Sequence, residues 1–373
     1  MRSGNGIDFE RQINGLTYRL FDKSSDINEL ETLFRECFPE EYSEGAFRDY
    51  IEWMDSSPSG PGMQLVACDG RKIVGALSFL RQTIVGFGET YVGALAGNAM
   101  TASNYRRRGV YRTLSEIAFE ELRKRDVHFV FGYTVQELVL RAEVKIGYSL
   151  IGDSKVYAFP LRPGKLLGLK RGLGWAGVLA DGPSRIMGTS YIRLKLLGLP
   201  HDPAIVVREV KEFPVDIDVI ANAKKSLSQY EVLKDARHLN WKYLKFYRSK
   251  EPHRFLVAER QGQVIGIGVC RRRPMRGLSG LAILDVLGVP ELEYEAITSI
   301  VKKQILIAME MHVDIIGCMV DEYSLLKQVL KKIGFLETDF RFRTIFKPLT
   351  RRLPRSIMEQ RFWRHTWGNS DTL

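Results

Sequence analysis

The residues best suited to chemistry in this chain form a basic turn between a strand and a helix. Three consecutive arginines, Arg106, Arg107 and Arg108, precede Gly109, and an amphipathic helix is predicted over residues 110–125. The first N–H groups of such a helix have no partner within it, and the positive end of the helix dipole attracts anions. Gly109 has no side chain to keep a phosphate away from the backbone. The turn therefore predicts a phosphate site, with a pyrophosphate as the expected occupant.

Two other interpretations of the arginines stay open at this point. A basic run is also typical of a solvated helix start, and a basic patch can bind nucleic acid. The turn by itself does not separate the three interpretations. Their separation depends on the elements that surround the turn.

Local patterns predict those elements in the first half of the chain. Apolar residues at helical spacing mark the helices, and Asp69-Gly70 marks a hairpin. Gly147 can end a helix because glycine adopts the left-handed conformation of a C′ residue. The predicted strands are 17–21, 64–68, 73–82, 90–101, 128–133 and 156–161, and the predicted helices are 27–37, 44–54, 110–125 and 136–146. The result is a mixed α+β unit.

The second half follows the same order of elements. Its predicted strands are 205–210, 253–259, 264–272, 281–287, 313–320 and 342–346, and its predicted helices are 217–227, 292–309 and 324–333. Lys145-Ile146-Gly147-Tyr148 in the first half corresponds to Lys332-Ile333-Gly334-Phe335 in the second. We interpret the two halves as a divergent internal duplication of one fold.

Together, the strand, the turn at residues 106–109, the following helix and strand, and the helix ending in Lys-Ile-Gly-Tyr resemble the GNAT superfamily of N-acetyltransferases. The signature of that family is Gln/Arg-x-x-Gly-x-Gly/Ala at the pyrophosphate of acetyl-CoA. Arg106 and Gly109 match it, whereas Tyr111 replaces its last small residue. The resemblance covers most of residues 15–160.

This resemblance implies two GNAT-like domains, each a mostly antiparallel twisted sheet flanked by helices, with acetyl-CoA as the acyl donor. It implies that the backbone of Ala99, Met100 and Thr101 pairs with the pantetheine arm. The pyrophosphate would be held by the amides of Arg107, Arg108, Gly109, Val110, Tyr111 and Arg112. Gln136 stands where the family often carries an asparagine that contacts the cofactor. The second half has Gly288-Val289-Pro290 after its strand, and proline removes an N–H donor, so we expect no CoA there.

Three residues are candidates for the proton transfers of an N-acyltransferase. The usual thiolate acid of the family is a tyrosine four residues ahead of the glycine, where this chain has Glu143. Glu143 can act as an acid if burial raises its pKa, and the alternative is a solvated helix glutamate. Tyr133 is either an acid or a core residue. Asp285, inside an apolar run, is either a base or an internal hydrogen-bond anchor.

Composition and charge bound these interpretations. The chain has 373 residues, a length that predicts two domains. Its formal net charge of +11 favours an anionic partner, whether a phosphate-bearing cofactor, nucleic acid or an acidic membrane surface, and does not choose among them. The six histidines and four scattered cysteines show neither metal-ligand nor disulfide spacing, so we expect no metal and reduced cysteines. We find neither a signal peptide nor about 18 consecutive apolar residues, and we expect a cytoplasmic protein.

We divide the chain into four segments. Residues 1–162 form the CoA-binding domain, 163–203 a basic Leu/Gly-rich linker, 204–348 a degenerate second GNAT-like domain, and 349–373 a basic aromatic tail. The linker is either a connecting helix or a strip that contacts an acidic membrane surface. The tail, with Phe362, Trp363 and Trp367, either docks on the core or stacks on a base.

The leading functional hypothesis is an acetyl-CoA-dependent N-acyltransferase that acts on a primary amine of a small molecule, such as an amino sugar. A first alternative is a transferase that moves an aminoacyl group from charged tRNA, although we do not expect a nucleic-acid partner. A second alternative is a CoA-responsive scaffold protein without turnover. The sequence does not indicate an oligomeric state.

Overall fold

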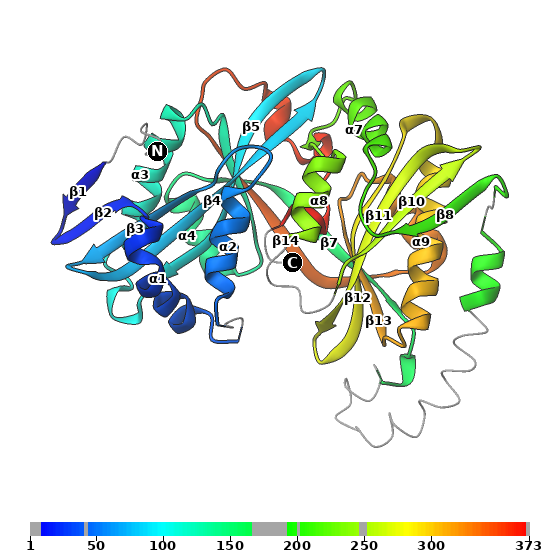
Figure 1. Cartoon of the computed structure of the whole chain (residues 1–373), viewed down its shortest axis with the longest axis horizontal. Helices are drawn as coiled ribbons and strands as arrows, with labels where there is room; N and C mark the ends of the chain where they lie inside the picture. Colours follow the sequence, from blue (N-terminus) through cyan, green and yellow to red (C-terminus); the bar gives the residue numbers. More distant parts are fainter. Residues whose placement is uncertain (1–8, 41–43, 166–191, 200–201, 246–251, 371–373) are drawn as a thin grey trace.

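One continuous β-sheet runs through both halves of the chain (Figure 1). The computed structural model describes residues 9–40, 44–165, 192–199, 202–245 and 252–370. Within them, fourteen strands belong to this sheet, and most neighbouring strands are antiparallel, as the sequence predicts. The α+β class is therefore confirmed. The described helices include none that is both long and apolar enough to cross a bilayer.

The first half contains the strands and helices expected for it. Most of their ends shift by a few residues, but the strand predicted at 156–161 begins at Ser149. Its strands are β1 (Glu10–Ile13), β2 (Leu16–Leu20), β3 (Met63–Asp69), β4 (Lys72–Gly86), β5 (Glu89–Thr101), β6 (Phe129–Thr134) and β7 (Ser149–Pro160). Its helices are α1 (Lys23–Cys37), α2 (Ala46–Asp55), α3 (Val110–Lys124) and α4 (Glu137–Lys145). Strand β1 is not predicted by the sequence pattern, because it is short and lies at the edge of the sheet with alternating half-exposed residues.

From its third strand onward, the second half repeats the order that the first half has from β3 to β7. Its strands are β8 (Ile205–Val210), β9 (Glu231–Val232), β10 (Arg254–Arg260), β11 (Gln263–Met275), β12 (Leu278–Gly288), β13 (Ile315–Val320) and β14 (Leu336–Pro348). Its helices are α7 (Asp218–Lys225), α8 (Ala236–Leu244), α9 (Glu293–Glu310) and α10 (Leu325–Ile333). Within the described strands, each half has one parallel pair, and the two pairs occupy corresponding positions. They are β5 with β6 in the first half and β12 with β13 in the second.

The two halves exchange their last strands, which differs from the expected arrangement of one sheet for each half. Strand β14 of the second half pairs with β6 and β7 of the first, and β7 pairs in turn with β13 of the second half. The order in the middle of the sheet is therefore β6-β14-β7-β13. Alternating apolar residues predict that a segment is a strand, but they do not specify which strand lies beside it.

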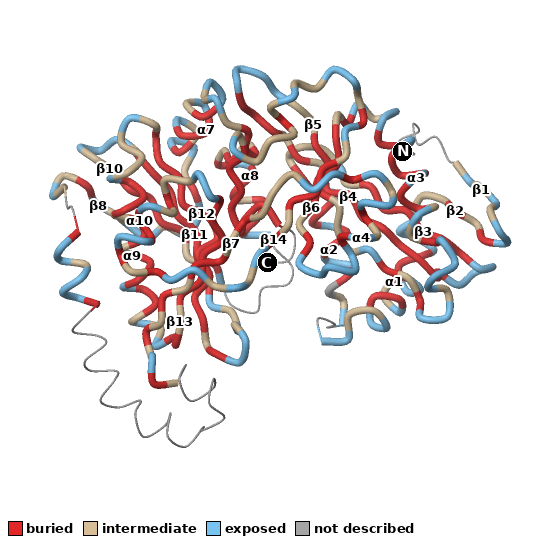
Figure 2. Tube along the Cα trace, turned by 180° about the vertical axis from the view of Figure 1, so that it is seen from behind, coloured by how far each residue is buried: buried red, intermediate tan, exposed pale blue. Residues whose placement is uncertain are grey.

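The C-terminal segment docks on the body of the molecule, which is the first of the two interpretations of the tail. It includes η4 (Arg355–Met358), η5 (Gln360–Phe362) and η6 (Trp367–Asn369). Trp363 and Trp367 are 3% and 7% exposed, and residues 363–370 are all buried (the trace in Figure 2 is coloured by burial). The Arg364 N–H donates to the carbonyl of Tyr230 at 2.9 Å. These indole rings are therefore covered and are not available to stack on a base.

Most of the predicted linker, residues 166–191, lies outside the described residues, so its two interpretations stay predictions. Residues 246–251, which follow α8, also lie outside the described residues. Trp241 itself lies in α8 and stacks on Trp53 of α2 with ring centroids 4.6 Å apart. This contact joins a helix of the first half to a helix of the second.

Candidate active site

A bulge in β5 opens the sheet at the point where the sequence predicts the donor arm. The register of β4 and β5 pairs Ser78 with Gly97 and Ala76 with Met100, so two residues of β5 face one of β4. One of the two is Asn98, whose φ is +45°. A bulge bends its strand and increases the local twist. Consequently, β5 and β6 are paired only over residues 93–95 and 129–131, and they separate beyond them.

This separation leaves main-chain groups of β5 without a strand partner on one side. Residues 96–101 have β4 as a neighbour but no described strand on the side of β6. Ala99 is exposed, Met100 is buried, and Thr101 is half-buried. The Thr101 carbonyl accepts from Arg106 Nε at 3.2 Å. An extended chain can therefore align with this stretch of β5 as an added strand does.

The basic turn lies directly after this open stretch. Gly109 precedes α3 with a left-handed backbone, φ +82°, and α3 has no side-chain cap. A side-chain carbon added at Gly109 would meet no atom within 4 Å, so the turn is open to its surroundings. Arg106, Arg107, Arg108 and Arg112 are exposed. Anions bind at uncapped helix N–H groups with exposed arginine residues beside them, so the turn stays the predicted phosphate site.

The start of α3 is held against the sheet by Val110. This residue is buried, and it packs over Gly75 of β4, where an added side-chain carbon would lie 2.5 Å from Val110 Cγ1. The turn is further fixed by Glu36, which accepts from the Ser103 N–H at 2.8 Å. The side chain of Arg108 lies over the ring of Tyr105, 5.0 Å from its centroid. The arginine-rich turn is therefore anchored on both sides.

Glu143 is buried between α3 and α4 rather than solvated. It is 8% exposed, and its Oε2 atom has no hydrogen-bond partner among the described residues. Burial raises the pKa of Glu143 to about 7. Burial and the nearby Glu143 carboxylate also raise the pKa of Tyr111, and the pKa of Tyr148 is raised by burial and by both neighbours. These three groups form one cluster, which we call the α3–α4 acid cluster.

Tyr133 lies on the opposite face of the sheet from α3. On β5, Ala94 lines a cavity together with Leu122 of α3, whereas its neighbour Gly93 faces the rings of Phe129 and Phe131. Because side chains alternate along a strand, Phe129, Phe131 and then Tyr133 lie on the face that α3 does not cover. Tyr133 is two residues beyond Phe131, the last residue of β6 that pairs with β5.

The partner of Tyr133 comes from the C-terminal segment. The Tyr133 hydroxyl is 2.8 Å from Nδ1 of His365, and it also has a hydrogen bond with the Asn369 side chain. His365 is 3% exposed and stacks on Trp363 with ring centroids 5.2 Å apart. Its Nε2 atom has no partner in the described part of the chain. Burial lowers the pKa of His365 to about 3, so the ring is neutral.

Asp285 has the contacts of an internal hydrogen-bond anchor, one of the two interpretations that the sequence leaves open. Its carboxylate pairs with Lys234 Nζ at 2.5 Å and accepts from Thr366 Oγ1 at 2.6 Å and from the Tyr243 hydroxyl. Burial acts to raise its pKa, but Lys234 and these hydrogen bonds outweigh that effect and lower it. Gln136, the remaining candidate, is exposed at the start of α4.

The predicted site residues therefore fall into three places. The open stretch of β5, the turn and Glu143 share the α3 side of the sheet, Tyr133 lies on the other face, and Asp285 lies in the second half. Sequence reasoning missed Asn98 and His365. An asparagine inside an apolar strand was a weak signal for a bulge, since asparagine tolerates positive φ. No local signal identified His365, because its contact with Tyr133 spans 232 residues of chain.

Comparison with known proteins gives a family model for part of the first half and a fold for the chain. The family model described as an acetyltransferase (GNAT) domain matches residues 18–148. A GCN5-related N-acetyltransferase from Anabaena variabilis superposes with a TM-score of 0.62 at 14% identity, over 90% of this chain and 73% of its own. A probable N-acyltransferase from Enterococcus faecalis superposes with a TM-score of 0.60 at 11% identity, over 90% of this chain and 73% of its own.

A third solved structure is similar over a comparable length. Saccharomyces cerevisiae N-myristoyltransferase with bound myristoyl-CoA has a TM-score of 0.59 at 11% identity, over 91% of this chain and 80% of its own. At these identities the likeness is one of fold. A comparison with curated proteins finds no match.

Proposed function

We propose that this chain transfers an acetyl group to a primary amine of a small molecule. The premise is that the chain carries a GNAT acetyltransferase domain at residues 18–148 and is an acyl-CoA-dependent N-acyltransferase. Amino sugars are one such class. The observation that carries the proposal is the continuity of the open β5 backbone with the uncapped start of α3. An extended arm with a diphosphate at one end matches that surface.

The turn supplies the affinity for the donor. The amides of Arg107, Arg108, Gly109, Val110, Tyr111 and Arg112 would surround the pyrophosphate, and the exposed arginines would add charge. The backbone of Ala99, Met100 and Thr101 would pair with the pantetheine arm, with Gln136 beside it. The donor supplies an acyl group activated as a thioester. The chain's part is to hold the thioester beside the amine, which is chiefly positioning.

The acid cluster supports the second half of the reaction. Transfer releases a thiolate, and a neutral carboxylic acid beside the sulfur can give it a proton. Glu143 fits that role because burial keeps much of its population protonated near pH 7. Tyr111 takes part as a neutral phenol, since the pKa of its hydroxyl is raised. Glu143 would thus replace the tyrosine that the family usually carries four residues ahead of the glycine, here Gly147.

The acceptor side is the face that carries Tyr133. The amine would approach the thioester where β5 and β6 are no longer paired, from the face that α3 does not cover. Tyr133 and His365 form a fixed neutral pair there and would orient the amine. Asp285 stays a candidate base by prediction, but its three partners favour a structural role.

The experiment for donor binding compares two glycines by isothermal titration calorimetry with acetyl-CoA. Gly109→Val places a side chain in the turn at φ +82°, whereas Gly15→Val does the same at φ +77° in a distant hairpin, and both sites are open. Each costs about 1–2 kcal/mol of backbone strain. We expect at least tenfold weaker acetyl-CoA binding for the first variant alone. Equal affinities in both variants contradict the role of the turn.

The experiment for turnover follows release of free thiol from acetyl-CoA with a panel of small primary amines. An enzyme releases thiol in proportion to a preferred amine. A CoA-responsive scaffold binds acetyl-CoA but releases no thiol above the rate without enzyme. Tight acetyl-CoA binding without thiol release by any amine therefore favours the scaffold alternative. Loss of the aminoacyl group from charged tRNA, without release of thiol from acetyl-CoA, favours the aminoacyl transferase.

A further inference from the structure

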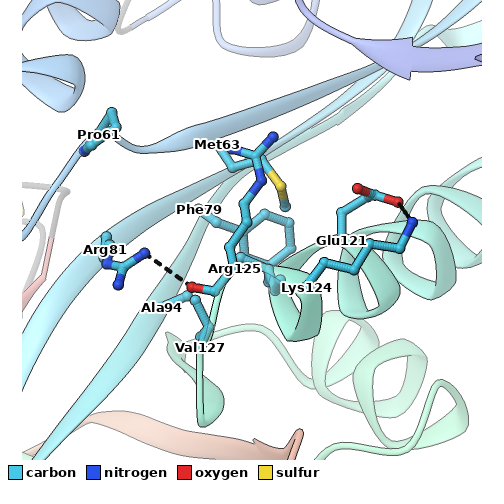
Figure 3. A pocket seen from close by; sticks show the side chains of 10 residues that line it. Pro61, Met63, Phe79, Arg81, Ala94, Glu121, Lys124, Arg125 and Val127 are labelled. Atoms are coloured by element: carbon cyan, nitrogen blue, oxygen red, sulfur yellow. Dashed lines mark hydrogen bonds and ion pairs between the residues drawn. The ribbon is translucent and has the colours of Figure 1, made fainter. Parts of the chain in front are cut away.

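A cavity of about 370 Å³ lies at the far end of α3 from the basic turn (Figure 3). It is bounded by α3, by the loop that follows it, and by strands β3, β4 and β5. The fifteen residues of α3 place the cavity about 22 Å from the turn, at 1.5 Å per residue. Its volume is within the range of small-molecule sites, about 300–1,000 Å³. No step of the proposed acyl transfer uses it.

The floor of the cavity is apolar and buried. It consists of Met63, Phe79, Ala94, Leu122 and Val127, each less than 5% exposed. Figure 3 shows the ring of Phe79 behind the side chain of Arg125. An aliphatic or aromatic group placed on this floor would lose its contact with water, which is favourable in proportion to the apolar area covered.

The rim is strongly basic, and its charges are only partly compensated. Arg81 uses one guanidinium nitrogen to donate to the main-chain carbonyl of Arg125, at 3.1 Å. The guanidinium of Arg125 has no hydrogen bond or ion pair among the described residues. The only carboxylate in the lining is that of Glu121, and it is already paired with Lys124 at 2.7 Å. The lining therefore carries three cations and one anion.

We propose that this cavity binds an amphipathic anion, with its charged head on Arg81 and Arg125 and its apolar body on Phe79 and Met63. A guanidinium is planar and holds a carboxylate or a phosphate with two parallel hydrogen bonds. The apolar floor selects against small inorganic anions, because they would leave it exposed. A carboxylate and a phosphate ester share this chemistry, and the choice between them is made by experiment.

Arg81 also connects the cavity to α3. Its bond to the Arg125 carbonyl caps the C-terminal end of the helix, and Arg125 N–H in turn donates to Leu122 at 3.1 Å. An anion that binds Arg81 therefore competes with the hydrogen bond that caps the C-terminal end of α3, the helix whose N-terminal end follows the basic turn. The binding site itself does not depend on the proposed acyl transfer.

The test is calorimetry of the full chain with octanoate and octyl phosphate, and with 1-octanol as a neutral probe. Either anion is expected to bind at least tenfold more tightly than octanol, and the tighter of the two identifies the head group. Arg125→Gln should weaken the binding of that anion by about tenfold or more. Arg123→Gln removes the same charge two residues earlier, outside the cavity, and should leave the affinity within about twofold.

Three results would overturn the proposal. One is no binding of either anion at millimolar concentration. Another is equal loss in the Arg125 and Arg123 variants, which indicates general charge attraction. The third is displacement of the anion by acetyl-CoA, which places both ligands at one site. Failure of acetyl-CoA to bind the turn, by contrast, would leave this site unaffected, because neither probe contains a CoA group.

Discussion

Glu143 is the residue whose protonation matters most for the proposed reaction. Burial raises its pKa to about 7, so it is largely protonated below that pH and largely ionised above it. As a proton donor, Glu143 loses its function when it ionises. We therefore expect kcat to fall as pH rises through about 7, measured by thiol release at saturating acetyl-CoA and amine.

Glu143→Gln removes the ionisable proton and keeps the shape of the side chain. We expect kcat to fall by roughly a hundredfold, with a similar KM for acetyl-CoA and no fall of activity near pH 7. Glu137→Gln, on the exposed face of α4, is the matched control and should behave as the wild type. An unchanged pH profile in Glu143→Gln means that another group gives the proton.

The same pKa has a consequence for stability. Because the folded chain holds the Glu143 proton more tightly than the unfolded chain, whose carboxyl has its ordinary pKa, the folded state binds more protons between the two values. The free energy of unfolding therefore falls as pH rises toward 7, to the extent that Glu143 contributes to it. The Gln variant should lack this loss in urea titrations.

At the scale of elements, the ion pair of Lys234 and Asp285 ties β12 to the segment before α8 and, through Thr366, to the C-terminal segment. Both side chains are almost fully buried. Removing one partner leaves an unpaired buried charge, so Asp285→Asn should lower the free energy of unfolding by about 3–5 kcal/mol. We expect its kcat, measured where the variant is folded, to stay within severalfold of the wild type.

The variant Lys234→Met with Asp285→Leu removes both charges and should be more stable than Asp285→Asn alone. Urea unfolding and thiol release on the same preparations check both expectations. If Asp285→Asn keeps its stability but loses turnover, Asp285 is a base and its anchoring role is secondary.

Most helices and strands, though not β1, β9 or α8, were accessible from the sequence because their signals are local. The apolar spacing of α3, the hairpin at Asp69-Gly70 and the end of α4 at Gly147 each depend on a few neighbouring residues. The turn was accessible for the same reason. The exchange of β7 and β14, the bulge at Asn98 and the contact of Tyr133 with His365 depend on residues far apart in the chain, and no local pattern encodes them.

At the scale of the whole molecule, the strand exchange makes each half depend on the other. Without β14, strands β6 and β7 of the first half lose the strand that joins them. We therefore expect residues 1–203 alone to lack a cooperative unfolding transition and to bind acetyl-CoA poorly. Co-expression with residues 204–373 should restore both, as followed by tryptophan fluorescence and calorimetry.

This expectation contrasts with the division of the sequence into self-contained domains. A fragment of residues 1–203 that folds cooperatively and binds acetyl-CoA with full affinity would show that the first half is independent and that β14 is an accessory strand. The division into two domains remains a proposal until that experiment.

Amide hydrogen exchange with saturating acetyl-CoA tests the central claim most directly, because the claim concerns main-chain N–H groups. We predict slower exchange in peptides that cover residues 97–101 and 107–112, and no such change at residues 284–293, the corresponding stretch of the second half. Unchanged exchange at residues 107–112 under saturating acetyl-CoA, or protection confined to the second half, would contradict the site.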